Sequence, residues 1–447
     1  MSDLKTFPQG GVHPSDQKLS AHKQIMVLKL PPVVKIPLSQ HLGAPAMAVV
    51  KKGDKVKVGT LIAQSGGFIS ANIHASVSGT VSMIGESTDT SGYLKEVVII
   101  NVEGDEWEDS IDRSSDLKKE IVKTREEIIE TVKNLGLVGL GGATFPTHVK
   151  LMVPPGKKAQ ILIINGVECE PYLTSDHRVM LERADEMLVG IKIIMKALSV
   201  EKAVIGIENN KSDAIKHLSD KIKDYPGITV QPLKVMYPQG GEKQLIKAIT
   251  GREVPNKGGL PIDVGVVVQN VGTAFSVYEA VQKNKPLLER IVTITGKSVK
   301  NPGNYLIRIG TSIADLIEAA GGLPEDTGKI ISGGPMMGKA LTGIDVPVVK
   351  GTSGILIMTK KDAKRELQGS CIRCGKCISV CPLGLEPYLL YQLSNRRKFD
   401  RLESEDVMNC CECGSCQYTC PSSLPLLDYM RLGKLEVGKL IRARKNN

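Results

Sequence analysis

The C-terminal part of this chain takes its fold from Cys371-Ile-Arg-Cys374-Gly-Lys-Cys377-Ile-Ser-Val-Cys381-Pro382. The spacing recurs in Cys410-Cys-Glu-Cys413-Gly-Ser-Cys416-Gln-Tyr-Thr-Cys420-Pro421. Both copies follow the pattern C-x2-C-x2-C-x3-C-P. Three thiolates spaced three residues apart on a tight loop can reach three corners of one 4Fe–4S cubane, and the fourth points away from it. The pair of motifs therefore predicts two 4Fe–4S clusters in one small domain.

The same spacing predicts that the two copies exchange their fourth ligand, as in two-cluster bacterial ferredoxins. We expect one cluster on Cys371, Cys374, Cys377 and Cys420, and the other on Cys410, Cys413, Cys416 and Cys381. Cys411 is left over, and the spacing assigns it no role. Structural zinc is the alternative, but zinc ribbons separate two C-x2-C pairs by a longer loop. Four cysteines within 11 residues, twice, are too dense for that arrangement.

Composition excludes several classes of protein. The chain has 447 residues, 41% of them hydrophobic, which favours a globular protein of about three or four domains. No apolar run approaches the ~18 residues of a membrane-spanning helix, and the N-terminus lacks the apolar stretch of a secretory signal. Nine of the ten cysteines crowd between Cys371 and Cys420, which indicates metal and a reducing cytoplasm rather than disulfides. The net charge of 58 − 48 = +10 favours acidic partners or an anionic surface, and the few aromatic residues argue against nucleic acid.

In front of the cysteine motifs, the sequence divides into segments of different pattern. A β pattern with a turn signal at residues 51–54 changes near residue 117 to alternating helices and strands, including a long amphipathic helix over 178–198. This alternation is typical of an α/β layer domain. We expect an N-terminal segment (1–29), a β-domain (30–104), an α/β domain (117–285), a small mixed unit (286–350), a dicluster domain (360–425) and a basic helical tail (426–447).

A glycine-dense loop occupies residues 136–147. A Rossmann fingerprint needs a strand before such a loop, and here a helical pattern precedes it, so that fingerprint is rejected. Glycines still let backbone N–H groups approach a phosphate or a ring closely, and Lys150 follows at a distance suited to neutralising a phosphate. A close-packed turn without a ligand is the alternative.

A second candidate site is Asn165-Gly-Val-Glu-Cys-Glu-Pro-Tyr172, which directly follows the apolar strand expected at 161–164. α/β domains place their ligands at the ends of such strands. Polar side chains there can hydrogen-bond a heteroaromatic ring or a ribose. A solvated loop with incidental acids is the alternative for this motif alone.

Four motifs together resemble the FMN- and NADH-binding subunit of respiratory complex I. They are, in order, 139–146, 165–171, Tyr237-Pro-Gln-Gly-Gly-Glu242 and 266–273. With Gly10-Gly-Val-His-Pro14, the β-domain in front and the dicluster motif behind, the chain is identified as a member of a closer family. This is the RnfC family, which belongs to the Rnf complex, the ion-translocating ferredoxin:NAD oxidoreductase. The resemblance covers nearly the whole chain and implies non-covalently bound FMN, with NAD(H) as substrate stacked on its ring.

The resemblance also implies which residues contact the two molecules. Phe145, Glu170 and Glu242 would lie toward the nicotinamide of NAD. The complex I protein usually has Asp where this chain has Val167, and Gln269 replaces an expected Asn. No residue is implied as an acid or base, because the reaction is hydride transfer at FMN. The FMN contacts would be Gly139, Gly141, Gly142, Lys150, Asn165, Glu168, Tyr237, Gly240, Gln269, Asn270 and Thr273.

Two other segments resemble known units. Residues 46–84 resemble the barrel-sandwich fold of biotinyl and lipoyl carriers, but the stretch 64–69, at the place of their modified Lys, contains no Lys, so we expect docking or structural support. Residues 290–345 resemble the β-grasp, SLBB-like unit that follows the flavin domain in complex I. The expected fold class is therefore multidomain α/β, with an N-terminal barrel-sandwich domain, a flavin/NAD domain, a β-grasp unit and a C-terminal two-cluster ferredoxin-like α domain.

The family implies one subunit of an enzyme, a ferredoxin:NAD⁺ oxidoreductase that translocates ions. It would lie peripherally on the cytoplasmic face of the cell membrane, and its partners would be other Rnf subunits, including membrane-embedded ones and a ferredoxin-type subunit. Two alternatives are a soluble bifurcating hydrogenase or diaphorase subunit, against which the β-domain argues, and a flavin-less scaffold with clusters only, which Val167 favours.

The basic tail predicts salt-sensitive attachment to membrane partners or anionic lipid. An apolar face at helical spacing accompanies its positive charge. A solvated helical end is the alternative. The cations on which this prediction depends are Arg431, Lys434, Lys439, Arg442, Arg444 and Lys445.

Overall fold

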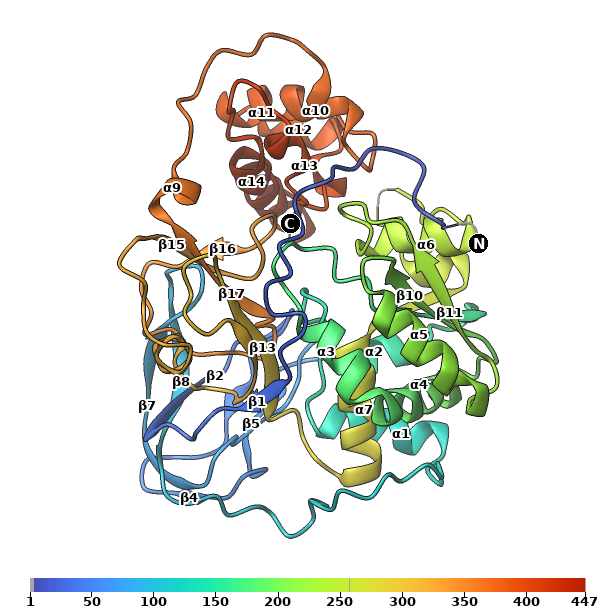
Figure 1. Ribbon diagram of the computed structural model, residues 1–447, viewed down its shortest axis with the longest axis vertical. Coiled ribbons are helices and arrows are strands. Elements are labelled where there is room, and N and C mark those ends of the chain that lie inside the picture. Colours follow the sequence, from blue (N-terminus) through green and yellow to red (C-terminus); the bar gives the residue numbers. More distant parts are fainter. Residues whose placement is uncertain (1–3, 257, 447) are drawn as a thin grey trace.

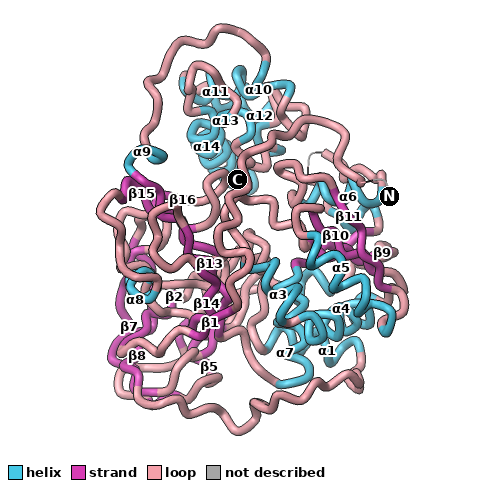
Figure 2. Tube along the Cα trace, in the orientation of Figure 1, coloured by secondary structure: helices cyan, strands magenta, loops and turns pink. Residues whose placement is uncertain are grey.

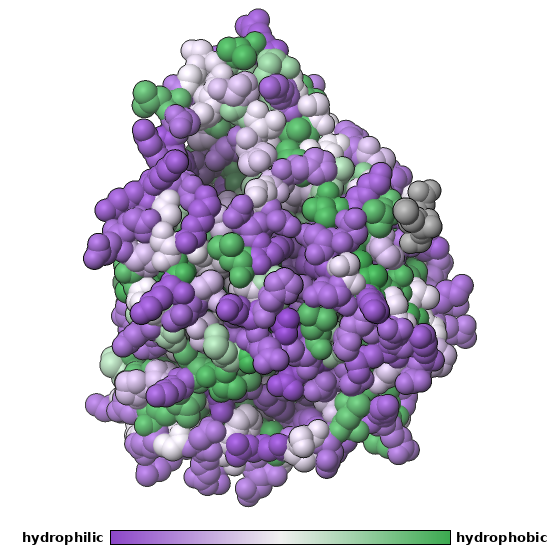
Figure 3. All heavy atoms as spheres, in the orientation of Figure 1, coloured by the Kyte–Doolittle hydropathy of each residue, from purple (hydrophilic) through white to green (hydrophobic). Residues whose placement is uncertain are grey.

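The computed structural model describes residues 4–256 and 258–446, and its parts follow one another in the predicted order (Figure 1). The multidomain α/β fold class is confirmed. Residues 1–3 of the N-terminal segment and Asn447 of the tail lie outside the described residues, as does the side chain of Lys445. Within the described part of the chain, no helix is long and apolar enough to cross a membrane. Hydrophilic side chains predominate on the face shown in Figure 3.

The β-domain consists of two small sheets with strand orders β2-β8-β7-β4 and β3-β5-β6. Its core side chains alternate along the strands, so that Val34, Ile36, Ile62, Ile73 and Ile100 are 0–1% exposed. This is the barrel-sandwich arrangement expected from the sequence. The strands are β2 (Val33–Pro37), β3 (Met47–Ala48), β4 (Lys55–Val56), β5 (Leu61–Gln64), β6 (Ile73–His74), β7 (Gly79–Thr88) and β8 (Leu94–Val102).

The α/β domain is built on a parallel sheet of order β11-β10-β9-β12. From β9 the chain adds β10 and β11 on one side of the sheet and then β12 on the other side. The crevice between the carboxyl ends of β9 and β12 is therefore the topological switch point at which such sheets bind ligands. The elements are α1 (Arg125–Asn134), α2 (Thr147–Leu151), β9 (Ile161–Asn165), α3 (Ser175–Glu182), α4 (Ala184–Leu198), β10 (Ala203–Glu208), α5 (Ser212–Lys221), η1 (Ile222–Asp224), β11 (Ile228–Leu233), α6 (Glu242–Thr250), η2 (Pro261–Val264), β12 (Val266–Asn270) and α7 (Val271–Lys283).

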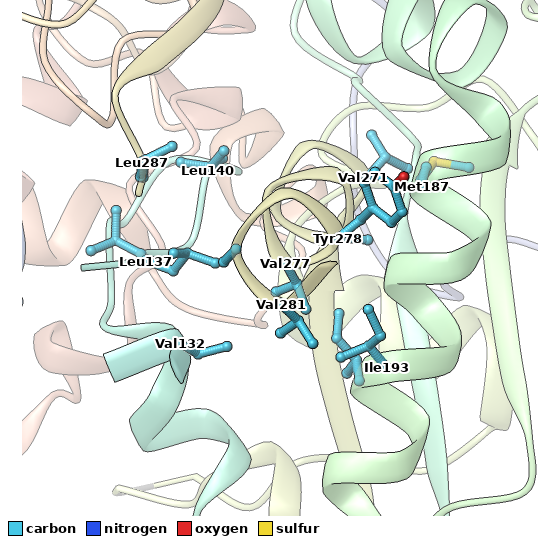
Figure 4. Packing of buried hydrophobic residues seen from close by; sticks show 14 of the residues in the cluster. Val132, Leu137, Leu140, Met187, Ile193, Val271, Val277, Tyr278, Val281 and Leu287 are labelled. Carbon is cyan, nitrogen blue, oxygen red and sulfur yellow. The ribbon is translucent and has the colours of Figure 1, made fainter. Parts of the chain in front are cut away.

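Helix α7 is buried among neighbours on several sides. Figure 4 shows Tyr278 and Val281 of α7 beside Met187 and Ile193 of α4, while Leu137 lies on another side of α7. The expected single helix over 178–198 is wrong in one respect, because Arg183 leaves helical geometry and separates α3 from α4. At the break, the carboxylate of Glu182 accepts the backbone N–H of Ile25, which ties the N-terminal segment to this domain.

The small mixed unit is a six-stranded sheet of order β1-β14-β13-β17-β15-β16. Its first strand comes from the N-terminal segment, since β1 (Ile25–Val27) pairs parallel with β14. The sheet also includes β17, just beyond residue 350. The other elements are β13 (Glu289–Thr295), β14 (Gly303–Arg308), α8 (Ile313–Ala319), β15 (Thr327–Ser332), β16 (Lys339–Ala340) and β17 (Gly354–Thr359).

The dicluster domain is helical and stands at the top of the molecule in Figures 1 and 2. Leu390, Leu402, Met430 and Val437 form its small core, so the predicted tail helix α14 is packed on the domain through Met430 and Val437. The elements are α9 (Lys360–Ala363), α10 (Lys376–Ser379), α11 (Pro387–Asn395), α12 (Phe399–Ser404), η3 (Val407–Asn409), α13 (Ser415–Tyr418) and α14 (Leu426–Asn446).

Candidate functional site

The glycine loop lies over the N-terminus of α7. The backbone N–H of Leu140 donates to Oγ1 of Thr273 at 2.9 Å, and Gly139 N–H closes the loop on the carbonyl of Phe145. Gly142 is exposed, has φ +132°, and a Cβ built on it would meet no atom of the described residues within 4 Å. The backbone of the loop is therefore open on the side where a flat ligand could approach.

The ends of β9 and β12 bring five predicted FMN contacts together. Asn165 and Asn270 are register partners, and the amide of Asn165 donates to the carbonyl of Gly240 at 2.8 Å. Oδ1 of Asn270 accepts the N–H groups of Gly272 and Thr273 and so caps α7. Beside them Gln269 is 3% exposed, and its Nε2 has no hydrogen-bond partner among the described residues. A buried amide donor without a partner, next to an open glycine loop, fits a polar ligand such as FMN.

Lys150 and Glu242 form an ion pair at the site. Nζ of Lys150 lies 2.8 Å from Oε1 of Glu242 and donates to the carbonyl of Val268 at 3.2 Å. Their side chains are 30% and 41% exposed, so both remain reachable from solvent. Lys150, predicted to oppose the flavin phosphate, is therefore paired with Glu242, which is predicted to lie toward the nicotinamide.

Two of the predicted contacts, Glu168 and Glu170, accept hydrogen bonds from backbone N–H groups nearby. The carboxylate of Glu168 accepts the N–H groups of Asp176 and His177 and so binds the N-terminus of α3. The carboxylate of Glu170 accepts the N–H groups of Met336 and Met337, at 3.1 and 2.7 Å, and burial raises its pKa to about 7. Glu170 is therefore held toward the turn after β15.

Sequence reasoning missed two charged residues here. Nζ of Lys18 donates to the carbonyls of Glu168, Glu170 and Leu173, which fixes the loop after β9 to the N-terminal segment. Oδ2 of Asp176 accepts the amide of Asn270 at 2.6 Å, and burial raises the pKa of Asp176 to about 7. Neither lies in a glycine or strand-end motif, so no local sequence signal marked them.

Val167, the departure from the complex I pattern, is fully buried. Its side chain packs in an apolar cluster with Ile163, Leu233 and Leu245 rather than facing a polar ligand. Phe145, the remaining residue predicted toward the nicotinamide, is half-buried at the end of the glycine loop.

The cysteines of the second motif converge as a group. Cys381 joins Cys410, Cys413 and Cys416 around one pocket, which apolar side chains also line. Burial raises the pKa of Cys410 to about 11, and the neighbouring Cys413 and Cys381 thiols contribute. In the first motif, burial raises the pKa of Cys377, and the nearby thiol of Cys420 adds to the shift. Four thiols on an apolar pocket fit a 4Fe–4S cluster, and this grouping is the one that crossed ligation requires.

The flavin motifs and the cluster cysteines are in direct contact. Tyr237 is 2% exposed, and its phenol donates to the carbonyl of Cys413 at 2.8 Å. The N-terminal segment crosses the same junction, where Val12 pairs with Tyr237 and the N–H of Gly11 donates to the carbonyl of Val380. The geometry therefore defines a flavin-type α/β domain joined to a dicluster iron–sulfur domain by buried contacts.

Comparison with known proteins extends this class to a family. Family models match over 132–279 (Nuo51 FMN-binding domain), 5–105 (RnfC barrel sandwich hybrid domain), 291–340 (SLBB domain) and 363–421 (4Fe-4S dicluster domain). The chain belongs to the RnfC family of the ion-translocating ferredoxin:NAD(+) oxidoreductase, or Rnf, complexes. The predicted FMN and the two predicted iron–sulfur clusters agree with these matches.

Two relatives support this assignment. The chain is 48% identical to the corresponding protein of the proton-translocating ferredoxin:NAD(+) oxidoreductase complex of Clostridium ljungdahlii, over 90% of this chain and 87% of that protein. It is 45% identical to the corresponding protein of the Na(+)-translocating complex of Acetobacterium woodii, over 98% of both. Two structures of an NAD+-reducing [NiFe]-hydrogenase, H2-reduced and air-oxidized, share the fold, with TM-scores of 0.50 and 0.51 at 16% identity. The match covers 70% of this chain but only 63% of the hydrogenase chain.

Proposed function

We propose that this chain is the subunit through which an ion-translocating ferredoxin:NAD⁺ oxidoreductase complex exchanges electrons with NAD(H). FMN, when bound, accepts a hydride from NADH and passes the electrons on one at a time. The open backbone at Gly142 and the unpaired amide of Gln269 would hold its ring system and tail, with Lys150 beside the phosphate. Glu242, paired with Lys150, would stand at the entrance for the nicotinamide.

The hydrogen bond from Tyr237 to Cys413 carries this proposal. It joins a residue of the flavin motifs to a ligand of the cluster bound by Cys410, Cys413, Cys416 and Cys381. Electron transfer works over short gaps, so this cluster would exchange electrons with the flavin first. We call it the inner cluster. The cluster bound mainly by Cys371, Cys374 and Cys377 would then be the outer one.

Two observations argue against the alternatives. The match to an FMN-binding domain over 132–279 favours a flavoprotein over a cluster-only scaffold, and burial of Val167 in the core explains its apolar side chain without loss of the site. The match over 5–105 to a barrel-sandwich domain named for RnfC favours a component of this complex over a soluble hydrogenase.

Peripheral attachment at the cytoplasmic face of the membrane, through membrane-embedded subunits and a ferredoxin-type subunit, is part of the proposal. The tail alone offers little for direct lipid binding. Arg431 and Lys434 pair with Glu412, and Arg444 pairs with Asp400 and Glu403. Attachment would therefore depend mainly on partner proteins.

The test is anaerobic reduction of the purified, cofactor-loaded chain by NADH. We expect bleaching of a flavin band at roughly 450 nm, followed by EPR signals from both clusters. Absence of flavin, or clusters that dithionite reduces but NADH does not, would contradict the proposal.

A further inference from the structure

The inference concerns residues 364–376, which we call the arch. The arch leaves α9 after Ala363, passes over the top of the dicluster domain and enters α10, and Figures 1 and 2 show it at the end of the molecule away from α4 and α7. The N–H of Gly369 donates to the carbonyl of Ser422, and Arg365 pairs with Asp428 at 3.0 Å. The arch is thus attached to the domain, and it presents Cys371 and Cys374 at the surface.

The two copies of the cysteine motif have the same backbone but different surroundings. Gly375 and Gly414 occupy equivalent positions, with φ +73° and +77°. A Cβ on Gly414 would lie 3.0 Å from the carbonyl oxygen of Met336, whereas one on Gly375 would meet nothing within 4 Å in the part of the chain that the structure describes. The second copy is therefore covered here by the chain's own β-grasp unit and by Tyr237, whereas the Cys371–Gly375 loop of the first copy is bare. The N-terminal segment touches the first copy at its other end, at Val380 and Cys381.

The charged side chains also differ between the two copies: those of the covered copy are paired, and those of the bare copy are not paired within residues 4–256 and 258–446. In the covered copy Glu412 bonds Arg431 and Lys434 of α14. Arg373 takes its place in the bare copy and has no acidic partner among the described residues. The same holds, within the described chain, for the two lysines at the ends of the arch, and only one residue of the arch is acidic. A group of positively charged side chains without acidic partners attracts an acidic surface.

Apolar side chains stand between these cations. Leu367 is 94% exposed and Ile372 is 67% exposed. At the top of the molecule in Figure 3, apolar and hydrophilic residues lie next to each other. Exposed apolar anchors with surrounding cations have the composition of a protein interface rather than of an ordinary solvated loop.

We propose that the arch docks an acidic electron-carrier protein, which exchanges single electrons with the outer cluster, bound mainly by Cys371, Cys374 and Cys377. This inference rests on the proposed function. In the direction from NADH, one electron leaves this chain and reduces one oxidised centre of the partner, and no bond forms or breaks. Two such transfers remove the electron pair that one hydride supplies. A lipid surface is less suited, because it offers no redox centre to the bare cluster.

The experiment uses the full chain with FMN and clusters, reduced by NADH and mixed in a stopped-flow instrument with an oxidised, acidic two-cluster bacterial ferredoxin as the probe. Arg373→Glu combined with Lys376→Glu should lower the second-order rate constant about tenfold or more at low salt and flatten its salt dependence. Leu367→Ser should lower the rate at all salt concentrations. Because Leu367 is 94% exposed, this variant has no packing to lose and should fold.

The matched control is Lys51→Glu combined with Lys52→Glu, which changes the net charge equally in the exposed turn before β4, at the opposite end of Figure 1. Its rate should stay at the wild-type value. Equal effects in the arch and the control, or no effect in any arch variant, would overturn the proposal. Arch variants that lose binding to vesicles containing anionic phospholipid but keep the wild-type ferredoxin rate would also overturn it. Iron content and NADH-dependent EPR of each variant distinguish failure of the docking proposal from failure of the proposed function. If NADH does not reduce the clusters, the proposed function is contradicted, whatever the ferredoxin rate.

Discussion

The phenol of Tyr237 donates a 2.8 Å hydrogen bond to the main-chain carbonyl of Cys413. These residues lie 176 positions apart and belong to the flavin motifs and the cluster motifs respectively. Tyr237 is also paired through its backbone with Val12, so three segments of the chain meet at one point. The relative position of the predicted flavin and the predicted inner cluster is therefore set by buried polar contacts rather than by a flexible linker.

Removing this bond should slow electron transfer inside the chain. Tyr237→Phe leaves the carbonyl of Cys413 without its partner, at a cost of about 1–3 kcal/mol to the junction. We expect both clusters to assemble, with slower reduction by NADH in freeze-quench EPR. Tyr278→Phe is the matched control, because Tyr278 is also buried and also bonds backbone, at Lys118 and Asp116, away from the clusters. Equal kinetics in the two variants would contradict a role for the Tyr237 bond.

Crossed ligation makes a specific prediction for Cys381. Cys381→Ser should damage the cluster bound mainly by Cys410, Cys413 and Cys416, because Cys381 lines their pocket. Iron content and low-temperature EPR of each cluster measure this. Loss confined to the cluster of its own motif would refute the crossed assignment.

Cys411 should be dispensable for cluster assembly. It lines the inner pocket and hydrogen-bonds the thiol of Cys413, but the motif spacing leaves it outside the eight ligands. Cys411→Ala should retain full iron content and lower the reduction potential of the inner cluster, because hydrogen bonds to ligand sulfurs stabilise the reduced state. Cys411→Ser, which keeps a donor, should restore the potential in an EPR-monitored redox titration. Loss of iron from the Ala variant would make Cys411 a ligand.

The open side of Gly142 predicts loss of flavin on substitution. Gly142→Val places a side chain where no atom of residues 4–256 and 258–446 lies within 4 Å and where FMN is expected. FMN occupancy should fall while both clusters remain. Gly53→Val controls for backbone strain, because Gly53 also has positive φ and open space around it but lies in the β-domain. Full FMN and full NADH:ferricyanide activity in Gly142→Val would place the flavin elsewhere.

The ionisation of Glu170 predicts a pH dependence. Burial raises its pKa from the ordinary 4.5 to about 7, so between these values the folded carboxyl holds a proton that the unfolded one has released. Stability from this group is therefore greatest below pH 4.5 and is lost as pH rises toward 7, at up to about 1.4 kcal/mol per pH unit. Glu170→Gln should flatten the pH profile of thermal unfolding in this window. The exposed Glu253→Gln should not, and an unchanged slope in Glu170→Gln would contradict the assignment.

The order of the parts and the cluster chemistry could be predicted without any structure. A motif such as Cys371–Cys381 carries all of its information within 11 residues, so its spacing alone predicts which thiols can reach a cubane. The alternating apolar patterns likewise indicated the sheets and most helices, because that periodicity is local. The glycine loop and the strand end at Asn165 could be selected for the same reason.

How these parts meet could be seen only once the chain was folded. The bonds of Lys18 to the loop after β9 join residues 150 to 155 positions apart, and β1 joins a sheet whose other strands begin at residue 289. Gly375 stays bare while the equivalent Gly414 is covered. Burial, and with it the pKa values of Glu170 and Asp176, depends on which distant surfaces pack together. No local pattern encodes that packing, because it arises only when domains far apart in the chain come into contact.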